Sequence, residues 1–223
     1  MLGYYLQQLI HSLPLFWKGL WMTFAVSILS LVGGTIIGFF AGLGRTSRSK
    51  TLRSILSVYV DFIRGTPFIV QVFILFFILP EWGVHLEAFH AAVLGLTICT
   101  GAYVCEIVKS GIEAIPVGQR EAAISTGLNR FQELRHIIVP QALRIILPPL
   151  VGQYVLMIKD SSVVSVIGVL DVTRAGWLTV QRIPQGLIVF GLVGVLYFLI
   201  CYPLIHLVNA LERKLTVQKT RLT

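Results

Sequence analysis

Five long apolar runs constrain this chain more than any other feature of its sequence. Each is long enough to cross a lipid bilayer, which takes about 20 apolar residues in a helix. Because the lipid core offers no hydrogen-bond partners, such runs must satisfy their backbone groups internally, as helices do. Of the 223 residues, 56% are hydrophobic and 13% charged, whereas soluble domains average about 45–50% apolar and about 25% charged residues. We therefore predict an all-α membrane protein, a single domain over residues 1–223, with five transmembrane helices at about residues 15–43, 57–80, 89–108, 145–170 and 187–207.

The basic residues predict how these helices are oriented. Most of the 18 Lys and Arg residues fall in three places: the turn after the first run, the loop between the third and fourth runs, and the C-terminal tail, which ends with Lys219 and Arg221. Basic loops stay on the cytoplasmic side of a membrane. We therefore expect the N-terminus outside and the C-terminus in the cytoplasm. The net charge of +8 then reports topology, and we expect no nucleic-acid partner.

Glycines in the first run predict a close helix contact. Gly34, Gly38 and Gly42 recur at every fourth residue and so line one face of a helix. A stripe of small residues lets a second transmembrane helix approach closely. This pattern predicts packing and says nothing about a substrate.

The loop between the third and fourth runs, about residues 116–140, contains a helix–turn–helix pattern. Pro116 and Gly118 interrupt the preceding helix, and about two helical turns fit between Gln119 and Thr126. Gly127 is suited to the left-handed residue that ends a helix. We expect a second helical piece to stop near Pro140, because proline disfavours a helical conformation in the residue before it. Such a loop forms a knob that another protein could grip.

Two polar segments interrupt apolar runs. The first is Arg64-Gly65-Thr66-Pro67, which fits either an interfacial arginine with a proline kink or part of a transport path. The second is Lys159-Asp160-Ser161-Ser162, which fits either a structural ion pair in a dimer or a site where Asp160 holds an ammonium group. Ionisable groups at such depth are costly and usually face a bundle interior or an aqueous cavity.

No pattern in the chain predicts catalysis. Gly-x4-Gly-Lys-Ser/Thr, His-Glu-x-x-His and Gly-x-Ser-x-Gly are all missing from the sequence, so the usual phosphate loop and two common hydrolase motifs are excluded. The three cysteines lie in apolar runs without the spacing of a metal site. We expect no catalytic residue, no metal site and no cofactor bound by this chain.

The loop resembles the EAA loop of the permease subunits of ABC importers. That loop has Glu-Ala-Ala, Gly four residues after the second Ala, and Ile-x-Leu-Pro. The matching residues here are Glu121, Ala122, Ala123, Gly127, Ile137 and Pro140, with Val139 in place of Leu.

Other segments are similar to the polar amino acid subfamily of these permeases, which serves His, Glu, Gln, Arg and related substrates such as opines. The similar segments are Arg64-Gly65-Thr66-Pro67 with Gln71, Gly101-Ala102-Tyr103 with Glu106, Lys159-Asp160-Ser161-Ser162 with Ser161 in place of Thr, and Asp171-Val172-Thr173-Arg174.

The resemblance implies a type I ABC importer permease in a bacterial inner membrane, crossing it several times. It implies two ATP-binding cassette subunits, which hold ATP and Mg²⁺, a second permease that is identical or homologous, and an extracytoplasmic amino-acid-binding protein. By the same resemblance, residues that contact substrate are Gln71, Thr100, Tyr103, Asp160 and Ser161. Residues that gate or line the path are Arg64, Thr66, Pro67 and Lys159. Residues that couple to the ATPase are Glu121, Ala122, Ala123, Gly127 and Pro140.

Two other functions fit an apolar helical bundle. A secondary amino acid transporter or channel would work without an ATPase partner, but such carriers usually have duplicated halves, which this sequence lacks. An exporter or a scaffold is the other alternative, and the Glu-Ala-Ala loop argues against it.

Overall fold

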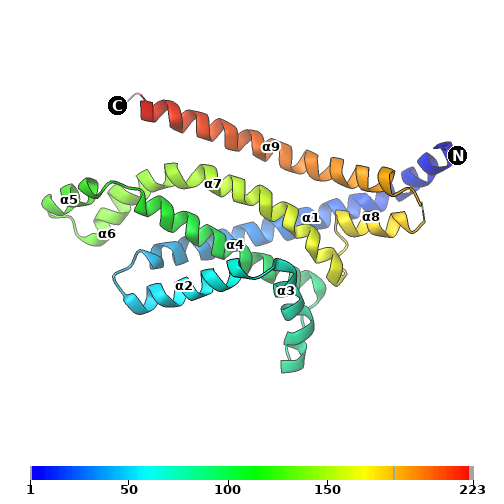
Figure 1. Ribbon diagram of the computed structural model, residues 1–223, viewed down its shortest axis with the longest axis horizontal. Helices are drawn as coiled ribbons and strands as arrows, with labels where there is room; N and C mark the ends of the chain where they lie inside the picture. Colours follow the sequence, from blue (N-terminus) through cyan, green and yellow to red (C-terminus); the bar gives the residue numbers. More distant parts are fainter. Residues whose placement is uncertain (1, 183, 221–223) are drawn as a thin grey trace.

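The computed structural model describes residues 2–182 and 184–220, with side chains at 7–182 and 184–213. Arg221, in the predicted basic tail, lies outside these ranges. The described residues form helices and turns, with no strand among them. The long helices are α1 (Leu2–Arg45), α4 (Ala88–Glu113), α7 (Val139–Asp160) and α9 (Gly186–Thr220). They extend roughly along the long axis of an elongated molecule (Figure 1).

Shorter helical elements connect the long ones. The short α-helices are α2 (Lys50–Gly65), α3 (Phe68–Phe73), α5 (Val117–Ser125), α6 (Arg130–Gln132) and α8 (Val172–Val180). Two π-helical turns, η1 (Ile74–Ile78) and η3 (Glu133–Ile138), and two 3₁₀ helices, η2 (Leu79–Trp82) and η4 (Ser161–Ile167), complete them. Figure 1 shows the segment that begins with α3 projecting away from the long axis.

The spans agree with the sequence prediction in outline. Among the described residues, four helical segments are long and apolar enough to cross a membrane, and a fifth span is present if a bent pair counts as one. That pair corresponds to the second predicted run. The chain bends by 105° between Lys50–Gly65 and Phe68–Trp82. The break falls at Thr66 and Pro67, because proline removes a backbone donor and favours extended backbone in the residue before it.

The glycine stripe joins α1 to α4, as predicted. A Cβ atom added at Gly34 would lie 2.4 Å from Thr100 Cβ, one at Gly38 would lie 2.5 Å from Val104 Cβ, and one at Gly42 would lie 2.6 Å from the Cβ of Val108. These three partners follow each other at four-residue intervals along α4. The two helices therefore pack along a shared seam that any larger side chain would separate.

The fourth span differs from the prediction at its start. The helical segment is continuous from Arg130 to Ile167, so the expected stop near Pro140 is wrong. Val139 is helical, with φ −61° and ψ −44°, although a proline follows it. The π-helical turn η3 ends at Ile138, and α7 begins at the next residue. The π-helical turn is wider than an α-helical turn. Such turns accommodate an interruption of the regular hydrogen-bond pattern without ending the helix.

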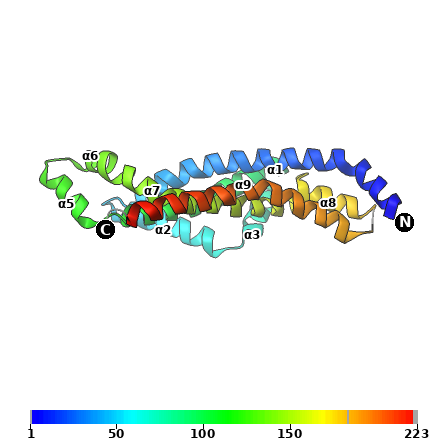
Figure 2. The same cartoon turned by 90° about the horizontal axis from the view of Figure 1, so that it is seen from above.

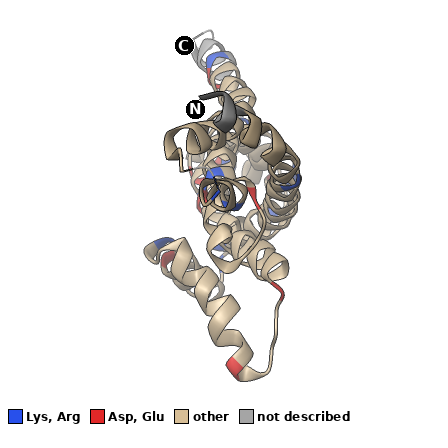
Figure 3. Cartoon of the chain, turned by 90° about the vertical axis from the view of Figure 1, so that its right-hand side faces the viewer, with Lys and Arg blue, Asp and Glu red and all other residues tan. Residues whose placement is uncertain are grey.

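The two ends of the bundle are different. The helices α5 and α6 lie at the end of the molecule where the C-terminus of α9 is found, and the N-terminus of α1 lies at the opposite end, in two perpendicular views (Figures 1 and 2). Seen from the N-terminal end, most of the ribbon carries neither acidic nor basic residues (Figure 3). An odd number of spans requires this separation of the termini. Which end faces the cytoplasm stays a prediction.

Candidate translocation site and coupling loop

Gln71 holds the bend between α2 and α3. Its side-chain Nε2 donates hydrogen bonds to the carbonyl oxygen of Ile63 at 2.7 Å, to the carbonyl oxygen of Thr66 at 3.1 Å and to Thr66 Oγ1 at 2.9 Å. The residue is only 7% exposed. These bonds satisfy carbonyl groups that the end of α2 leaves without helical partners. Gln71 and Thr66, both predicted for the translocation path, are therefore in direct contact at the bend.

Glu106 on α4 gathers basic side chains from three helices. Arg45, at the end of α1, forms an ion pair with Glu106 Oε2, and Arg64 Nη1 lies 3.5 Å from the same oxygen. The third cation is Lys109, whose Nζ lies 3.8 Å from Glu106 Oε1. One carboxylate therefore faces three cations, and Arg64, with 41% of its side chain exposed, is the most accessible of them.

Tyr103 connects this charged cluster to the end of α7. The guanidinium carbon of Arg64 lies 5.5 Å from the centroid of the Tyr103 ring, within the range of a cation–π contact. Tyr103 also packs beside a buried cluster that contains Met157 of α7. Asp160 follows Met157 by three residues and so lies on the same side of that helix. The fold thus brings Arg64, Tyr103 and the end of α7 into one region.

The helix changes type directly after Asp160. Here α7 ends, and the 3₁₀ helix η4 continues from Ser161. Asp160 is half-buried and Lys159 is exposed. Neither side chain forms an ion pair or hydrogen bond with another described residue. The carboxylate of Asp160 therefore has no ion-pair or hydrogen-bond partner within the described part of this chain.

Ser161 and Thr100, both predicted to contact substrate, are almost completely buried in this structure. Ser161 is 1% exposed, and its hydroxyl donates to the carbonyl oxygen of Ile158 at 2.7 Å. This bond gives a backbone carbonyl group a partner at the point where the α-helix passes into the narrower 3₁₀ helix. Thr100 is fully buried against Gly34, and its Oγ1 has no partner among the described residues. The remaining path residue, Pro67, is exposed at the start of α3.

The loop at about residues 116–140, which we call the coupling loop, begins with the predicted short helix, α5. Gly127 has φ +80°, its N–H donates to the carbonyl oxygen of Ile124, and the N–H of Leu128 donates to that of Ala123. This pair of bonds is the Schellman motif that ends many helices. Asn129 then begins α6 with a capping box closed by Gln132. The predicted helix, glycine turn and second helix are therefore confirmed.

The coupling loop exposes both charged and apolar side chains. Glu121 and Ala122 are exposed on α5, and Pro140 is exposed at the start of α7, whereas Ala123 is 4% exposed and faces the bundle. The loop also exposes three large apolar side chains. They are Val117, Ile124 and Phe131, which are 61–68% exposed. An apolar surface of this kind, beside charged groups, is typical of a protein–protein contact.

Sequence reasoning missed two arginine anchors in this loop. Arg120 Nη2 donates to the carbonyl oxygen of Ile112 at 3.2 Å, and Arg130 Nη2 donates to the carbonyl oxygen of Thr46 at 2.8 Å. The charges counted for topology gave no sign of these bonds, because their acceptors are backbone carbonyl groups that only the fold brings within reach. The pairing of Arg45 with Glu106 was missed for the same reason.

Comparison with known proteins gives consistent matches along the chain. A family described as "Binding-protein-dependent transport system inner membrane component" matches residues 34–217. The glutamine transport system permease protein GlnP of Escherichia coli (strain K12) is 37% identical over 208 residues, which cover 92% of this chain and 95% of that protein. The L-cystine transport system permease protein TcyB of Bacillus subtilis (strain 168) is 36% identical over 203 residues, covering 91% and 87%.

A solved structure supports the same assignment. One chain in a crystal structure of an amino acid ABC transporter with histidines superimposes with a TM-score of 0.86 at 34% identity, covering 92% of this chain and 96% of that one. The chain therefore belongs to the family of inner-membrane components of binding-protein-dependent transport systems.

Proposed function

We propose that this chain is the membrane-spanning permease subunit of an ABC importer for a polar amino acid. The exposed helix–glycine–helix loop at one end of an apolar bundle carries the proposal, because it offers a docking surface for a separate ATPase. Family membership favours this role over a secondary transporter or channel that lacks an ATPase. The energy source is then ATP with Mg²⁺ on the partner subunits.

The end of α7 is the best candidate for substrate contact. Asp160 is a half-buried acid that forms no ion pair or hydrogen bond in the described part of the chain, and it lies where the α-helix passes into a narrower 3₁₀ helix. Discontinuous helices of this kind form binding sites in many transporters. We assign Asp160 to the ammonium group of the amino acid. Tyr103 and Arg64 belong to the same region, and Gln71, Thr100 and Ser161 support its backbone and packing.

The mechanism is alternating access of a pair of permeases. An external binding protein delivers the amino acid, and the ATPases move the coupling loop as they close. The permease has two packings, and the nucleotide state determines which of them is favoured. Glu121, exposed on α5, is available to pair with a basic residue of the ATPase.

Uptake by the reconstituted importer tests this assignment. We expect Asp160→Asn to lower uptake of the transported amino acid by about tenfold to a hundredfold, because one charge-assisted hydrogen bond contributes about 1.5–3 kcal/mol. The assay uses proteoliposomes with the partner ATPase and binding protein, and a panel of labelled amino acids. ATP hydrolysis without substrate should remain.

The matched control is Asp61→Asn, which alters an exposed acid on α2. It should leave uptake unchanged. Normal uptake in Asp160→Asn would remove this residue from the translocation site. Wild-type uptake that needs no ATP would instead contradict the importer function itself.

A further inference from the structure

A pocket of about 150 Å³ with three charged residues in its lining lies behind the coupling loop. Its walls come from the end of α1, the turn that follows it, the end of α4 and the coupling loop. The residues that matter here are Thr46, Ile112, Arg120, Arg130 and Glu133. The pocket therefore lies where the coupling loop meets the helices that it is expected to move.

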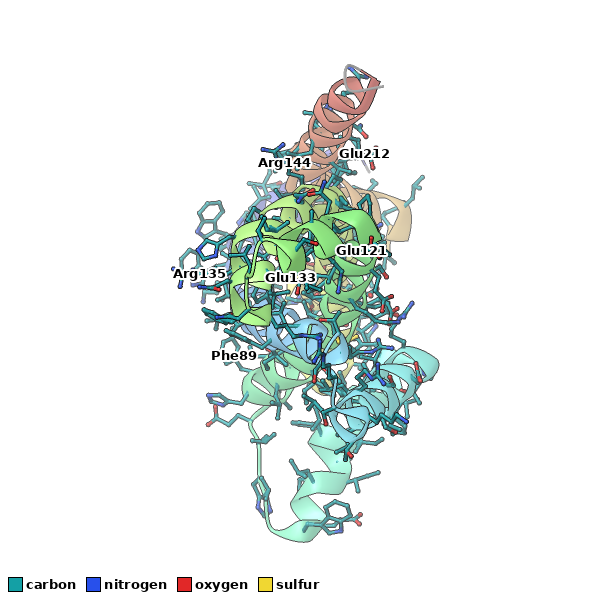
Figure 4. All side chains as sticks on the ribbon, turned by 90° about the vertical axis from the view of Figure 1, so that its left-hand side faces the viewer. Phe89, Glu121, Glu133, Arg135, Arg144 and Glu212 are labelled. Carbon is teal, nitrogen blue, oxygen red and sulfur yellow. The ribbon has the colours of Figure 1, made fainter. Side chains whose placement is uncertain are left out.

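Glu133 is the unusual member of this pocket. It is 9% exposed, yet its carboxylate forms no hydrogen bond or ion pair with any other residue that the structure describes. In Figure 4 Glu133 lies between the ribbons at this end of the molecule, whereas Arg135 of the same turn projects outward. An ion pair in such a partly enclosed place is screened less by water than one on the open surface, so Glu133 is a favourable acceptor for a basic side chain that lines the pocket.

Two arginines line the same pocket and use only part of their hydrogen-bonding capacity. Arg130 donates to the carbonyl oxygen of Thr46, and Arg120 donates to that of Ile112, each through Nη2. A guanidinium has five N–H groups, and neither side chain forms another hydrogen bond with a described residue. The pocket thus combines two guanidinium groups, each with N–H groups that no described residue accepts, and one carboxylate.

Arg130 is in position to change partners. It precedes Glu133 by three residues, a spacing at which oppositely charged side chains on a helix meet. Instead, Arg130 donates to the carbonyl of Thr46, 84 residues away in sequence. Because Arg130 and Glu133 line the same pocket, a change of the Arg130 side chain can exchange this backbone carbonyl for the carboxylate.

We propose that Glu133 is the alternative partner of Arg130, and that this exchange attaches the coupling loop to the α1–α2 turn and releases it during transport. In the attached arrangement, Arg130 holds the carbonyl of Thr46. In the released arrangement, Arg130 pairs with Glu133 and the loop moves without the turn. The inference rests on the proposed function, because it gives the importer a two-state element at its coupling loop.

The attachment has a direct connection to the candidate translocation site. Thr46 lies in the turn that leads into α2, and α2 carries Arg64 at its far end, where Arg64 contacts Glu106 and Tyr103. A loop that is alternately fixed to this turn and free of it can pass its movement to the bend. A loop that stayed in one arrangement could not pass its movement to the bend both when the ATPases close and when they open.

Two substitutions separate the arrangements in the assembled importer. We expect Glu133→Gln to favour attachment and to lower both uptake and substrate-stimulated ATP hydrolysis at least fivefold. We expect Arg130→Ala to favour release, so that ATP hydrolysis continues while the number of amino acids moved per ATP falls at least fivefold. Arg135→Gln is the matched control, since Arg135 is exposed on the same turn, and it should behave as wild type.

The distance between two spin labels reports the exchange directly. If Glu133 had only a structural role, the proportions of these distances would not depend on it. Labels are placed at Arg48→Cys and His136→Cys, both exposed, in a chain whose Cys99, Cys105 and Cys201 have been replaced. The importer should give two distances whose proportions change between the nucleotide-free and ATP-bound states. In the Glu133→Gln variant we expect only one of the two distances.

The outcomes keep the two proposals apart. A wild-type complex without ATP-dependent uptake would contradict the proposed function. If wild-type uptake is normal, a single distance that neither ATP nor Glu133→Gln alters overturns the exchange. Wild-type uptake and stoichiometry in both Glu133→Gln and Arg130→Ala also overturn it. If Glu133→Gln fails to assemble, the wild-type distances and Arg130→Ala still decide.

Discussion

At the scale of single residues, Gln71 and Ser161 of the predicted path donate hydrogen bonds to local structural partners. All three bonds of Gln71 Nε2 go to residues at the bend, and the hydroxyl of Ser161 goes to the backbone of α7. Asp160 differs because it forms no ion pair or hydrogen bond with a described residue. A transporter needs both kinds of residue: one to keep a broken helix in shape, and one to remain available to a substrate.

Gln71→Leu tests the structural role. The substitution leaves the carbonyls of Ile63 and Thr66 without their side-chain donor, which should lower the free energy of unfolding by about 1–3 kcal/mol. We expect a lower thermal midpoint for the purified chain in detergent, and similar losses of uptake for every transported amino acid. Gln181→Leu, at an exposed glutamine, is the control. A loss confined to one amino acid with no change in the midpoint would show that Gln71 acts through substrate contact.

At the scale of elements, the glycine turn after α5 sets the shape of the coupling loop. Gly127 adopts φ +80°, a region in which a side chain is strained. The next two elements, α6 and η3, start from that turn and carry Arg130 and Glu133. The direction in which the loop leaves α5 therefore depends on one residue.

Gly127→Ala should loosen this turn without disturbing the bundle. A left-handed conformation costs an alanine roughly 1–2 kcal/mol. We expect faster amide hydrogen exchange in α5 and weaker coupling of ATP hydrolysis to uptake, while exchange in α4 stays unchanged. Gly118→Ala is the matched control, because Gly118 lies in α5 without a positive φ and has no neighbour within 4 Å. Equal exchange in α5 for Gly127→Ala and wild type would contradict the role of this turn.

At the scale of the whole molecule, the seam between α1 and α4 holds the longest contact of the bundle. Apolar surface gives little preference for helix association in lipid, so close packing of backbones must supply it. Thr35 adds a link from α1 to α7 through Tyr154, whose hydroxyl lies 2.6 Å from Thr35 Oγ1. The helix α1 is therefore held by the two spans that also carry Tyr103 and Asp160.

Gly38→Leu should weaken this seam. A Cβ at Gly38 already lies 2.6 Å from the carbonyl oxygen of Gly101, so a larger side chain forces the helices apart and should cost about 1–3 kcal/mol. We expect a lower thermal midpoint and a lower yield of folded protein. Gly191→Leu, where no atom lies within 4 Å, serves as the control in the purified chain. A midpoint equal to that of wild type would show that the seam tolerates separation.

The sequence by itself determined the class of fold, the packing face of α1 and the form of the coupling loop. These features follow from local patterns: run length, a four-residue glycine repeat, and a glycine placed between two short helical segments. The continuous helix through Pro140, the hydrogen bonds by which Gln71 holds the bend, the cluster around Glu106 and the position of Glu133 in the pocket were decided only by the tertiary structure. Each of them depends on whether a turn widens, or on which distant group faces a side chain. That is fixed by packing between segments far apart in the chain, and no local pattern encodes it.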